Sequence, residues 1–248
     1  EALKETFLDS YVTFENGNLV IDSGNTATQN YQFFGQGYNS DGSPMKGGVW
    51  EDNSQTSLLW MLKLGYYDSD EMKEAAEELL VENIRNENPD ESSIRADYGE
   101  NTLAAGFLGA NVITPVLSDN GHADVAYDLL LQDEQPSWLY EVEAGATTVW
   151  ERWNSYTEGV GFGDAEMNSF NHYAYGAVVE WMYRYMAGIT ADEENPGFKH
   201  IILQPALDTE QLTMIRQESI PWKEPMILIW EPLLQPGQAR AREKTQNL

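Results

Sequence analysis

Amphipathic helices that follow one another across short turns constrain the fold of this chain most. A helix is predicted over 54–65, where Leu58, Leu59 and Leu62 recur at helical spacing before a glycine. A second helix is predicted over 70–85, with apolar residues on one face and glutamates on the opposite face. Because such a pair leaves apolar surface uncovered, further helices must pack against it.

The same period predicts three further helices, at 101–118, 122–132 and 168–187. Pro115 lies near the end of the first of these helices and can kink it. Gly188 is expected to cap the last helix. Helices paired across glycine-containing turns indicate an α/α-toroid.

The remaining segments are predicted as loops and short strands. Residues 7–50 and 136–160 lack a clean period and are expected to be irregular, apart from one short strand at 18–22. After Pro196, the β-branched run at 198–205 predicts another strand. The toroid is therefore expected to pass into a β-domain.

The balance of charge excludes several classes of partner. The chain has 41 Asp and Glu against 14 Lys and Arg, which gives a net charge of −27. Nucleic acid is not expected, because a phosphate backbone needs a positive footprint, and an anionic membrane surface is disfavoured for the same reason. No apolar run approaches the roughly 18 residues that span a bilayer. A content of 8 Trp, 13 Tyr and 8 Phe predicts a packed core.

Few residues are suited to metal or covalent chemistry. The chain has no Cys and 3 His, so neither a thiolate nucleophile nor a His-rich metal site is expected, and no cofactor is predicted. An acidic chain rich in aromatic residues is instead typical of carbohydrate-active proteins, in which rings stack on sugars and carboxylates bind hydroxyls. The cellular compartment, cytoplasmic or secreted, and the oligomeric state are left open.

The most distinctive local feature is Glu151, which stands between Trp150 and Trp153. A carboxylate flanked by indoles is partly desolvated and suits base catalysis. The alternative is a surface ion pair with Arg152 or another cation, which would be inert. The second feature is His172, which lies among aromatic residues and can donate to a substrate hydroxyl, or can be a satisfied core histidine.

Five segments in a fixed order carry a resemblance to a known family. They are Asn120-Gly-His-Ala-Asp-Val-Ala-Tyr127, Pro136-Ser-Trp-Leu-Tyr140, Gly145-Ala-Thr-Thr-Val-Trp-Glu151, Ser169-Phe-Asn-His-Tyr-Ala-Tyr-Gly176 and Pro196-Gly-Phe-Lys-His-Ile201. Over about 55–205 the series resembles the C-terminal half of the catalytic domain of bacterial α-L-rhamnosidases, glycoside hydrolase family 78. The resemblance implies a mainly α fold, a partial (α/α)6 barrel followed by the start of a small β-domain. It also implies inverting hydrolysis of terminal α-L-rhamnosides.

The resemblance implies roles for individual residues. The Glu of the family's Thr-Thr-x-Trp-Glu motif is the water-activating base, which here is Glu151, and the His of Asn-His-Tyr lines the sugar site, which here is His172. The indoles of Trp138, Trp150 and Trp153 are expected to bind the substrate, a rhamnose-containing glycoside or oligosaccharide.

The family's general acid lies far upstream, in a segment of Asp, Arg, Glu and Trp. Asp41, Glu51 and Asp52 stand in superficially similar segments, but these lack the Arg and lie too close to the helix that begins near Gln55. We interpret them as chance similarities. The chain begins at Glu1 without a signal-peptide pattern, and missing upstream residues are expected to supply the acid. The 248-residue stretch alone is therefore expected to show little hydrolysis.

Two other functions fit the same residues. One is another α/α-toroid glycosidase, phosphorylase-like or fucosidase-like, which a screen of nitrophenyl glycosides would separate. The other is a sugar-binding remnant without catalysis, which a second catalytic carboxyl upstream would exclude.

The family pattern continues to Leu203-Gln-Pro205 and is then lost. Residues 1–195 are expected to be the C-terminal part of the α/α-barrel catalytic domain, and 196–220 the start of the β-domain. Between Trp222 and Ala239 the proline spacing suits no strand.

Codons for Lys223–Ala239, displaced by two bases, can encode Gly-Thr-Tyr-Asp-Ser-Tyr-Met-Gly-Thr-Ile-Val-Ala-Ala-Trp-Thr-Ser. This hidden peptide contains the family's Tyr-Asp-Ser-like turn and Gly-x-Ile-x-x-x-Trp strand. We therefore predict a frameshift between about Asp208 and Trp222, which leaves 221–248 as a non-native tail. The run Arg240-Ala-Arg-Glu-Lys244 is then no basic motif.

Resequencing the DNA tests the frameshift. The codons of Lys223–Ala239 are expected to encode the hidden peptide in the displaced frame. An intact frame whose codons cannot encode that peptide would show that the tail is native sequence.

Overall fold

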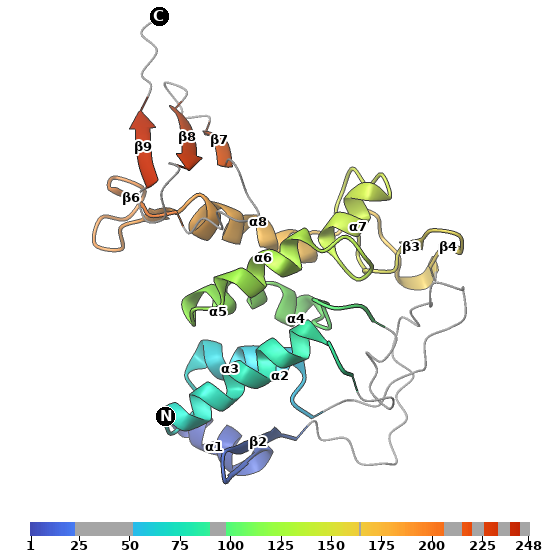
Figure 1. Ribbon diagram of the computed structural model, residues 1–248, viewed down its shortest axis with the longest axis vertical. Helices are drawn as coiled ribbons and strands as arrows, with labels where there is room; N and C mark the ends of the chain where they lie inside the picture. Colours follow the sequence, from blue (N-terminus) through green and yellow to red (C-terminus); the bar gives the residue numbers. More distant parts are fainter. Residues whose placement is uncertain are drawn as a thin grey trace, which may run out of the picture. The chain divides into compact units, whose positions relative to one another are not determined.

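A computed structural model describes residues 1–22, 52–89, 98–163 and 165–205, together with the backbone of three later strands at 215–219, 226–232 and 239–243. Figure 1 shows the order of the elements along the chain. The chain divides into two compact units, Glu1–Val178 and Val179–Leu248, which are described separately below.

The first unit opens with a helix and a hairpin. Helix α1 (Ala2–Tyr11) leads into β1 (Val12–Glu15) and β2 (Asn18–Ile21), which pair antiparallel. The two turn residues, Asn16 and Gly17, both have positive φ, 54° and 79°, as a tight hairpin turn requires. The predicted strand is confirmed. The loop predicted from residue 7 is wrong as far as Tyr11, because α1 buries no residue and so shows no apolar stripe.

Asn53 joins this hairpin to the helices that follow. Its side-chain oxygen accepts the Ile21 N–H at 2.6 Å, and its side-chain nitrogen donates to the Leu19 carbonyl at 3.0 Å. Its own N–H donates to the Ile21 carbonyl at 3.0 Å. One residue thus satisfies the open edge of β2 just before helix α2 (Gln55–Leu64) begins.

Helix α2 pairs with α3 (Asp70–Arg85), as the sequence predicts. Ser54 and Ser69 cap the two helices by accepting the N–H of the third residue along, and Gly65 ends α2 in the left-handed conformation. The apolar faces are buried; they comprise Leu58, Leu59, Met61 and Leu62 of α2, and Met72, Ala76, Leu80 and Ile84 of α3. Each large side chain buried here contributes roughly 1.5–3 kcal/mol.

The helix predicted over 101–118 begins later than expected. Residues 102–106 are non-helical. The buried Gln55 side chain donates to the Thr102 carbonyl at 2.9 Å and accepts the Ala104 N–H at 2.8 Å. These bonds engage backbone groups that a helix would use internally, so the local apolar pattern is overridden.

The helical part of this segment is itself divided. Helix α4 (Phe107–Ala110) ends before α5 (Ile113–Asp119), and Pro115 is the third residue of α5. A proline ring clashes with the carbonyl four residues earlier, here that of Asn111. The kink predicted at Pro115 therefore takes the form of a break in the helix between Ala110 and Ile113, on the N-terminal side of the proline.

Helix α6 (Ala123–Leu131) follows as predicted, and a further helix, α7 (Trp138–Glu143), was not predicted. Ser137 caps α7 by accepting the Tyr140 N–H at 3.1 Å. With six residues, α7 is too short for its period to be visible in the sequence. A small hairpin follows, formed by β3 (Tyr156–Thr157) and β4 (Gly161–Phe162).

The last predicted helix is not one continuous α-helix. Within the predicted range of 168–187 the helical pieces are η2 (Ala174–Ala177), α8 (Val178–Trp181) and the π-helical η3 (Met182–Met186). The short η1 (Ala165–Met167) precedes that range. Residues 168–173 between η1 and η2 are non-helical because their backbone pairs with residues 149–151, as described below. The predicted cap is confirmed, since Gly188 has a φ of 66°.

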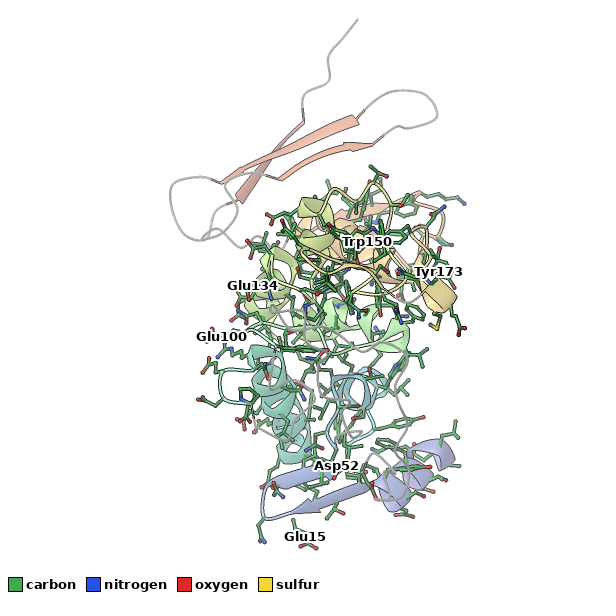
Figure 2. The ribbon with its side chains drawn as sticks, turned by 90° about the vertical axis from the view of Figure 1, so that its right-hand side faces the viewer. Glu15, Asp52, Glu100, Glu134, Trp150 and Tyr173 are labelled. Carbon is green, nitrogen blue, oxygen red and sulfur yellow. The ribbon has the colours of Figure 1, made fainter. Side chains whose placement is uncertain are left out.

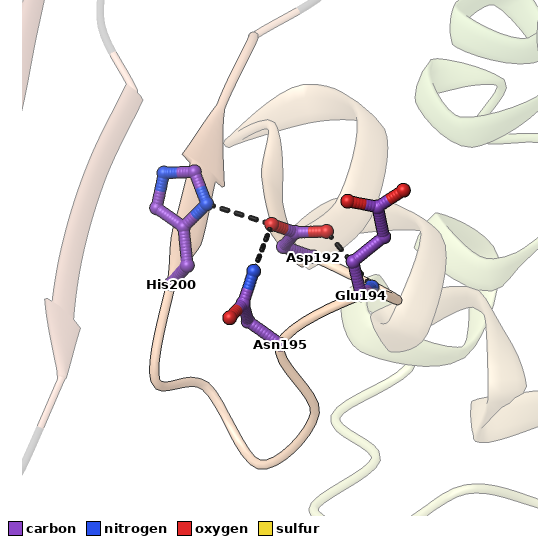
Figure 3. A network of polar contacts seen from close by, with 4 residues as sticks. All are labelled: Asp192, Glu194, Asn195 and His200. Carbon is purple, nitrogen blue, oxygen red and sulfur yellow. Dashed lines mark hydrogen bonds and ion pairs between the residues drawn. The ribbon is translucent and has the colours of Figure 1, made fainter.

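The described residues of the second unit form two antiparallel sheets. Strand β5 (Ile189–Ala191) pairs with β6 (Ile201–Leu203), which confirms the strand predicted after Pro196. Asp192 holds the connecting loop (Figure 3): it accepts from the Asn195 side chain and the His200 ring at 2.8 Å, and from the Glu194 N–H at 2.9 Å. The His200 bond is the main cause that lowers the pKa of the Asp192 carboxyl.

The later strands are β7 (Ile215–Ser219), β8 (Met226–Pro232) and β9 (Ala239–Glu243), in the sheet order β7-β8-β9. The expectation that the proline spacing allows no strand here is therefore wrong for β8. Pro232 lies beyond the part of β8 that pairs with β7, so its missing N–H interrupts no bond on that side of the strand. The frameshift itself stays a prediction.

Gly188 is predicted to be essential for the second unit. A Cβ at this position would lie 2.1 Å from the backbone of Gln204 and Pro205, and its φ is already left-handed. Gly188→Ala should lower the free energy of unfolding by roughly 2–5 kcal/mol, from backbone strain plus overpacking. Chemical denaturation followed by circular dichroism measures the change.

Gly197→Ala is the matched control. Gly197 also has a positive φ, 81°, but a Cβ there would meet nothing within 4 Å. It should cost only about 1–2 kcal/mol, the strain of the left-handed backbone alone. Equal costs at the two glycines would contradict the steric argument.

Candidate active site

Backbone pairing brings the two sequence-predicted site residues into one local structure. The His172 N–H donates to the Val149 carbonyl, and the Glu151 N–H donates to the Ser169 carbonyl, both at 2.9 Å. The Thr148 hydroxyl also donates to the Phe170 carbonyl. Residues 148–151 and 169–172 therefore run side by side, with Glu151 on one segment and His172 on the other.

The Glu151 carboxylate is half-buried and its contact is local. Its Oε2 accepts the Ser169 N–H at 2.7 Å, so the side chain folds back onto the paired segment. Within the described residues no ion pair joins Glu151 to Arg152, the inert alternative that the sequence left open. The arrangement engages one carboxylate oxygen and leaves Oε1 for another partner.

The His172 ring is held by a hydrogen bond and by stacking. Its Nδ1 accepts the Ala174 N–H at 3.3 Å, so a neutral ring carries its proton on Nε2 and can donate from there. The ring stacks on Phe107, with centroids 4.7 Å apart, and on Tyr173 at 5.4 Å. Tyr173, labelled in Figure 2, is 89% exposed and forms the outer ring of this stack.

The three tryptophans predicted to bind substrate differ in exposure. Trp138 and Trp150 are buried, and Trp153 is half-buried. The Trp153 ring stacks on Tyr175 with centroids 3.9 Å apart and meets Trp138 edge-on at 5.5 Å. The Trp138 indole N–H donates to the Tyr175 carbonyl at 2.9 Å. Trp138 and Trp150 are therefore packed against neighbouring rings in this structure, and Trp153 is the indole of the three that retains more exposed surface.

Glu141 is a buried carboxylate of this region that the sequence analysis missed. It lies on α7 one turn after Trp138, and the two are the buried residues of that helix. Its Oε2 accepts the Trp150 N–H at 3.3 Å, and its Oε1 has no hydrogen-bond partner among the described residues. Burial raises the pKa of the Glu141 carboxyl to about 7, an effect that the Trp150 bond partly offsets. Its i, i+3 spacing from Trp138 is the sequence signal that could have revealed it.

The charged groups of the site share one environment around Tyr175. Burial raises the pKa of the Tyr175 hydroxyl well above its ordinary value, and the charges of Glu141 and Glu151 raise it further, while Arg152 lowers it. Arg152 is itself buried. Its backbone N–H donates to the Ser155 hydroxyl at 3.2 Å, and its side-chain Nε has no hydrogen-bond partner among the described residues. Two acids and a cation thus influence the Tyr175 hydroxyl.

Of the three acids interpreted above as chance similarities to the general-acid segment, the structure describes one, Asp52. Asp52 lies next to the N-terminal hairpin, and Figure 2 shows it at the opposite end of the first unit from Trp150. Asp41 and Glu51 fall outside the described residues. A hollow of about 350 Å³ beside α7, lined by Tyr140, Glu143, Ala144, Tyr156 and Glu158, contains none of the predicted site residues.

Within the described part of the chain, no cluster of three or more His, Asp or Glu could hold a metal ion. None of the described helices is long and apolar enough to cross a membrane.

The buried Glu141 predicts a pH-dependent change in stability. Its folded-state pKa of about 7 is above its ordinary value of 4.5, so the folded protein binds the proton more tightly and loses stability as the pH rises from about 4.5 to about 7. Glu141→Gln carries no charge at any pH. It should match the unsubstituted chain at pH 4.5 and exceed it by on the order of 2 kcal/mol at pH 8.

Urea denaturation at the two pH values measures this difference. Glu143→Gln, at an exposed position of the same helix, is the control and should shift stability little at either pH. A gain from Glu141→Gln that is the same at pH 4.5 and pH 8 would contradict the burial of an ionisable group.

Comparison with known proteins identifies the family. Residues 2–186 match the model of the bacterial alpha-L-rhamnosidase 6 hairpin glycosidase domain. An alpha-L-rhamnosidase of Formosa agariphila is 40% identical over 161 residues, which cover 64% of this chain and 16% of that protein. One of Streptomyces avermitilis is 52% identical over 103 residues, which cover 42% of this chain and 10% of that protein. The chain thus spans a small part of the length of these relatives.

Solved structures confirm the predicted fold class. The crystal structure of the Streptomyces avermitilis alpha-L-rhamnosidase complexed with L-rhamnose aligns with a TM-score of 0.64 and 32% identity, covering 94% of this chain and 18% of that chain. The native enzyme from Aspergillus terreus aligns with a TM-score of 0.67 and 25% identity, covering 92% of this chain and 21% of that chain. The mainly helical architecture, a partial six-hairpin toroid, agrees with both. The chain belongs to the bacterial α-L-rhamnosidase family with a six-hairpin glycosidase domain.

Proposed function

We propose that this chain supplies the general-base side of an active site that hydrolyses terminal α-L-rhamnosides with inversion. The observation that carries the proposal is the placement of the Glu151 carboxylate on the backbone pair that also holds His172. The solved Streptomyces avermitilis relative is complexed with L-rhamnose, which supports a rhamnose-containing glycoside or oligosaccharide as the substrate class.

The chemistry follows from the state of the Glu151 carboxylate. An inverting glycosidase uses one carboxylate to take a proton from water while a second carboxyl group, about 6.5–9.5 Å away, protonates the leaving oxygen. The Ser169 N–H holds Oε2 and fixes the direction of the side chain, so Oε1 is the oxygen that accepts the proton from water. Water then attacks the anomeric carbon from the face opposite the leaving group.

The general acid is expected from another part of the catalytic domain. Glu141 has the raised pKa that an acid requires, but its carboxyl is 4% exposed and bonded to the Trp150 backbone. A covered carboxyl cannot reach a glycosidic oxygen, so Glu141 is not assigned this role.

His172 is proposed to bind the sugar. Since its Nδ1 accepts the Ala174 N–H, its Nε2–H is the group that can donate to a sugar hydroxyl. The rings of Phe107 and Tyr173 stack on the imidazole and restrict its orientation. Trp153, half-buried beside Tyr175, is the tryptophan proposed to form the wall of the site.

The alternative functions differ in whether they need the Glu151 carboxylate. A sugar-binding protein without catalysis needs the ring stack and His172 but no base, and would be indifferent to the Glu151 carboxylate. A different toroid glycosidase is disfavoured because both curated relatives described above are alpha-L-rhamnosidases.

Glu151→Gln tests the base assignment. In a protein that carries this chain within a complete six-hairpin domain, the substitution keeps size and hydrogen bonding but removes the proton acceptor. The kcat for an aryl α-L-rhamnoside should fall by roughly 10²–10⁴-fold. Glu143→Gln is the control and should retain activity. A near-normal kcat in Glu151→Gln would remove Glu151 from the mechanism.

His172→Ala tests the sugar-binding role. Loss of the Nε2–H donor should raise KM for the rhamnoside by about tenfold or more, since a hydrogen bond to substrate typically contributes about 1.5 kcal/mol. His122→Ala, at the start of α6, is the matched control and should leave KM unchanged. If His172→Ala alters neither KM nor kcat, the residue is a packing histidine.

A further inference from the structure

One buried titratable group has no part in the proposed mechanism. The Glu141 side chain is 4% exposed, yet it bonds to the residue immediately before the proposed base. A buried carboxyl usually needs partners for both oxygens, whereas Oε1 of Glu141 has none among the described residues.

The direction of the Trp150 N–H explains why a side chain is needed there. In an extended segment, successive N–H groups point to opposite sides. The Glu151 N–H points toward Ser169 and the paired segment, so the Trp150 N–H points away from it. Glu141 on α7 accepts that outward N–H at 3.3 Å. Its carboxyl oxygen thus does what a backbone carbonyl of a neighbouring strand would otherwise do.

Trp150 is held by its side chain as well as by its backbone. Its indole packs edge-on against Phe170, with centroids 5.4 Å apart, and against Tyr156 at 6.4 Å. The two successive peptides on either side of Trp150 are therefore held by different partners: the 149–150 peptide by α7, and the 150–151 peptide by residues 169–172.

We propose that Glu141 is a positioning residue for Glu151: its neutral carboxyl holds the Trp150 N–H and keeps the base in place, and its ionisation loosens that hold. The inference rests on the proposed function of Glu151 as the base. Glu141 itself touches no substrate.

Burial determines the pH at which the hold is lost. The groups that share its environment are Tyr175 on η2, and Glu151 and Arg152 on the paired loop. Burial raises the pKa of Glu141 to about 7, so it is protonated at pH 6 and ionised at pH 8.5. An ionised carboxylate there has the Trp150 N–H as its one hydrogen bond among the described residues. Ionisation therefore makes the buried position of the Glu141 side chain against Trp150 less favourable.

A direct test needs no activity. In ¹⁵N-labelled protein, the Trp150 backbone amide should shift between pH 5.5 and 8.5 with a midpoint near 7. The shift should vanish in Glu141→Gln and persist in Glu143→Gln. A Trp150 amide that does not titrate in the unsubstituted chain, or that titrates unchanged in Glu141→Gln, would overturn the proposal.

The kinetic test separates positioning from simple stability. In the complete domain at pH 6, Glu141→Gln keeps a neutral acceptor, so its kcat should stay within about threefold of normal. Glu141→Leu has no acceptor, so its kcat should fall by about tenfold or more with little change in KM. A misplacement of a catalytic group by about 1 Å can cost roughly 10²-fold in rate. The kcat ratio of Glu141→Gln to the unsubstituted enzyme should rise through pH 7. A ratio independent of pH, or a normal kcat in Glu141→Leu, would overturn the proposal.

The two proposals fail in distinguishable ways. If Glu151→Gln is fully active, Glu151 is not the base and Glu141 does not position a base. The titration of the Trp150 amide would still show that Glu141 contacts Trp150. If Glu151→Gln is inactive but the Glu141 variants show neither the pH-dependent ratio nor the loss in Glu141→Leu, the base assignment stands and the positioning role is wrong.

Discussion

The pairing of residues 148–151 with 169–172 is the interaction on which the site depends. Its two backbone hydrogen bonds place Glu151 and His172 on adjacent segments, although the chain between them passes through a hairpin and a short helical turn. The same pairing takes residues 168–173 out of the helix that their aromatic periodicity predicts. The local loss of helix is therefore what brings the segments of Glu151 and His172, the two candidate site residues, together, because a continuous helix would have used those backbone groups internally.

The helices around this pair supply its support. Helix α7 contributes Trp138, whose indole N–H bonds to Tyr175, and Glu141, whose carboxyl bonds to Trp150. Helix α4 contributes Phe107, on which the His172 ring stacks. Two helices of the first unit thus support the pair: α7 contacts the segment that carries the proposed base, and α4 contacts the segment that carries His172. A buried carboxyl within an aromatic cluster is unfavourable for stability when ionised, which is consistent with a cost tolerated for function.

Some elements could be predicted from the sequence because their determinants are local. The faces of α2, α3 and α6 repeat at helical spacing, and Ser54 and Gly65 mark where α2 begins and ends. Elements whose determinants lie elsewhere in the chain were missed or misplaced. Residues 102–106 are non-helical because the distant Gln55 side chain binds their backbone, and α7 is too short for a period to be visible.

The sequence by itself determined the helical class, the family motifs and the identity of Glu151 and His172 as the residues to consider, because these depend on residue type, order and spacing. Only the tertiary structure decided their surroundings: that Ser169 holds Glu151, that Trp138 and Trp150 are buried, and that Glu141 accepts the N–H of the residue before Glu151. The physical reason is that burial and hydrogen-bond partners arise from contacts between distant segments, whereas periodicity records only neighbours along the chain.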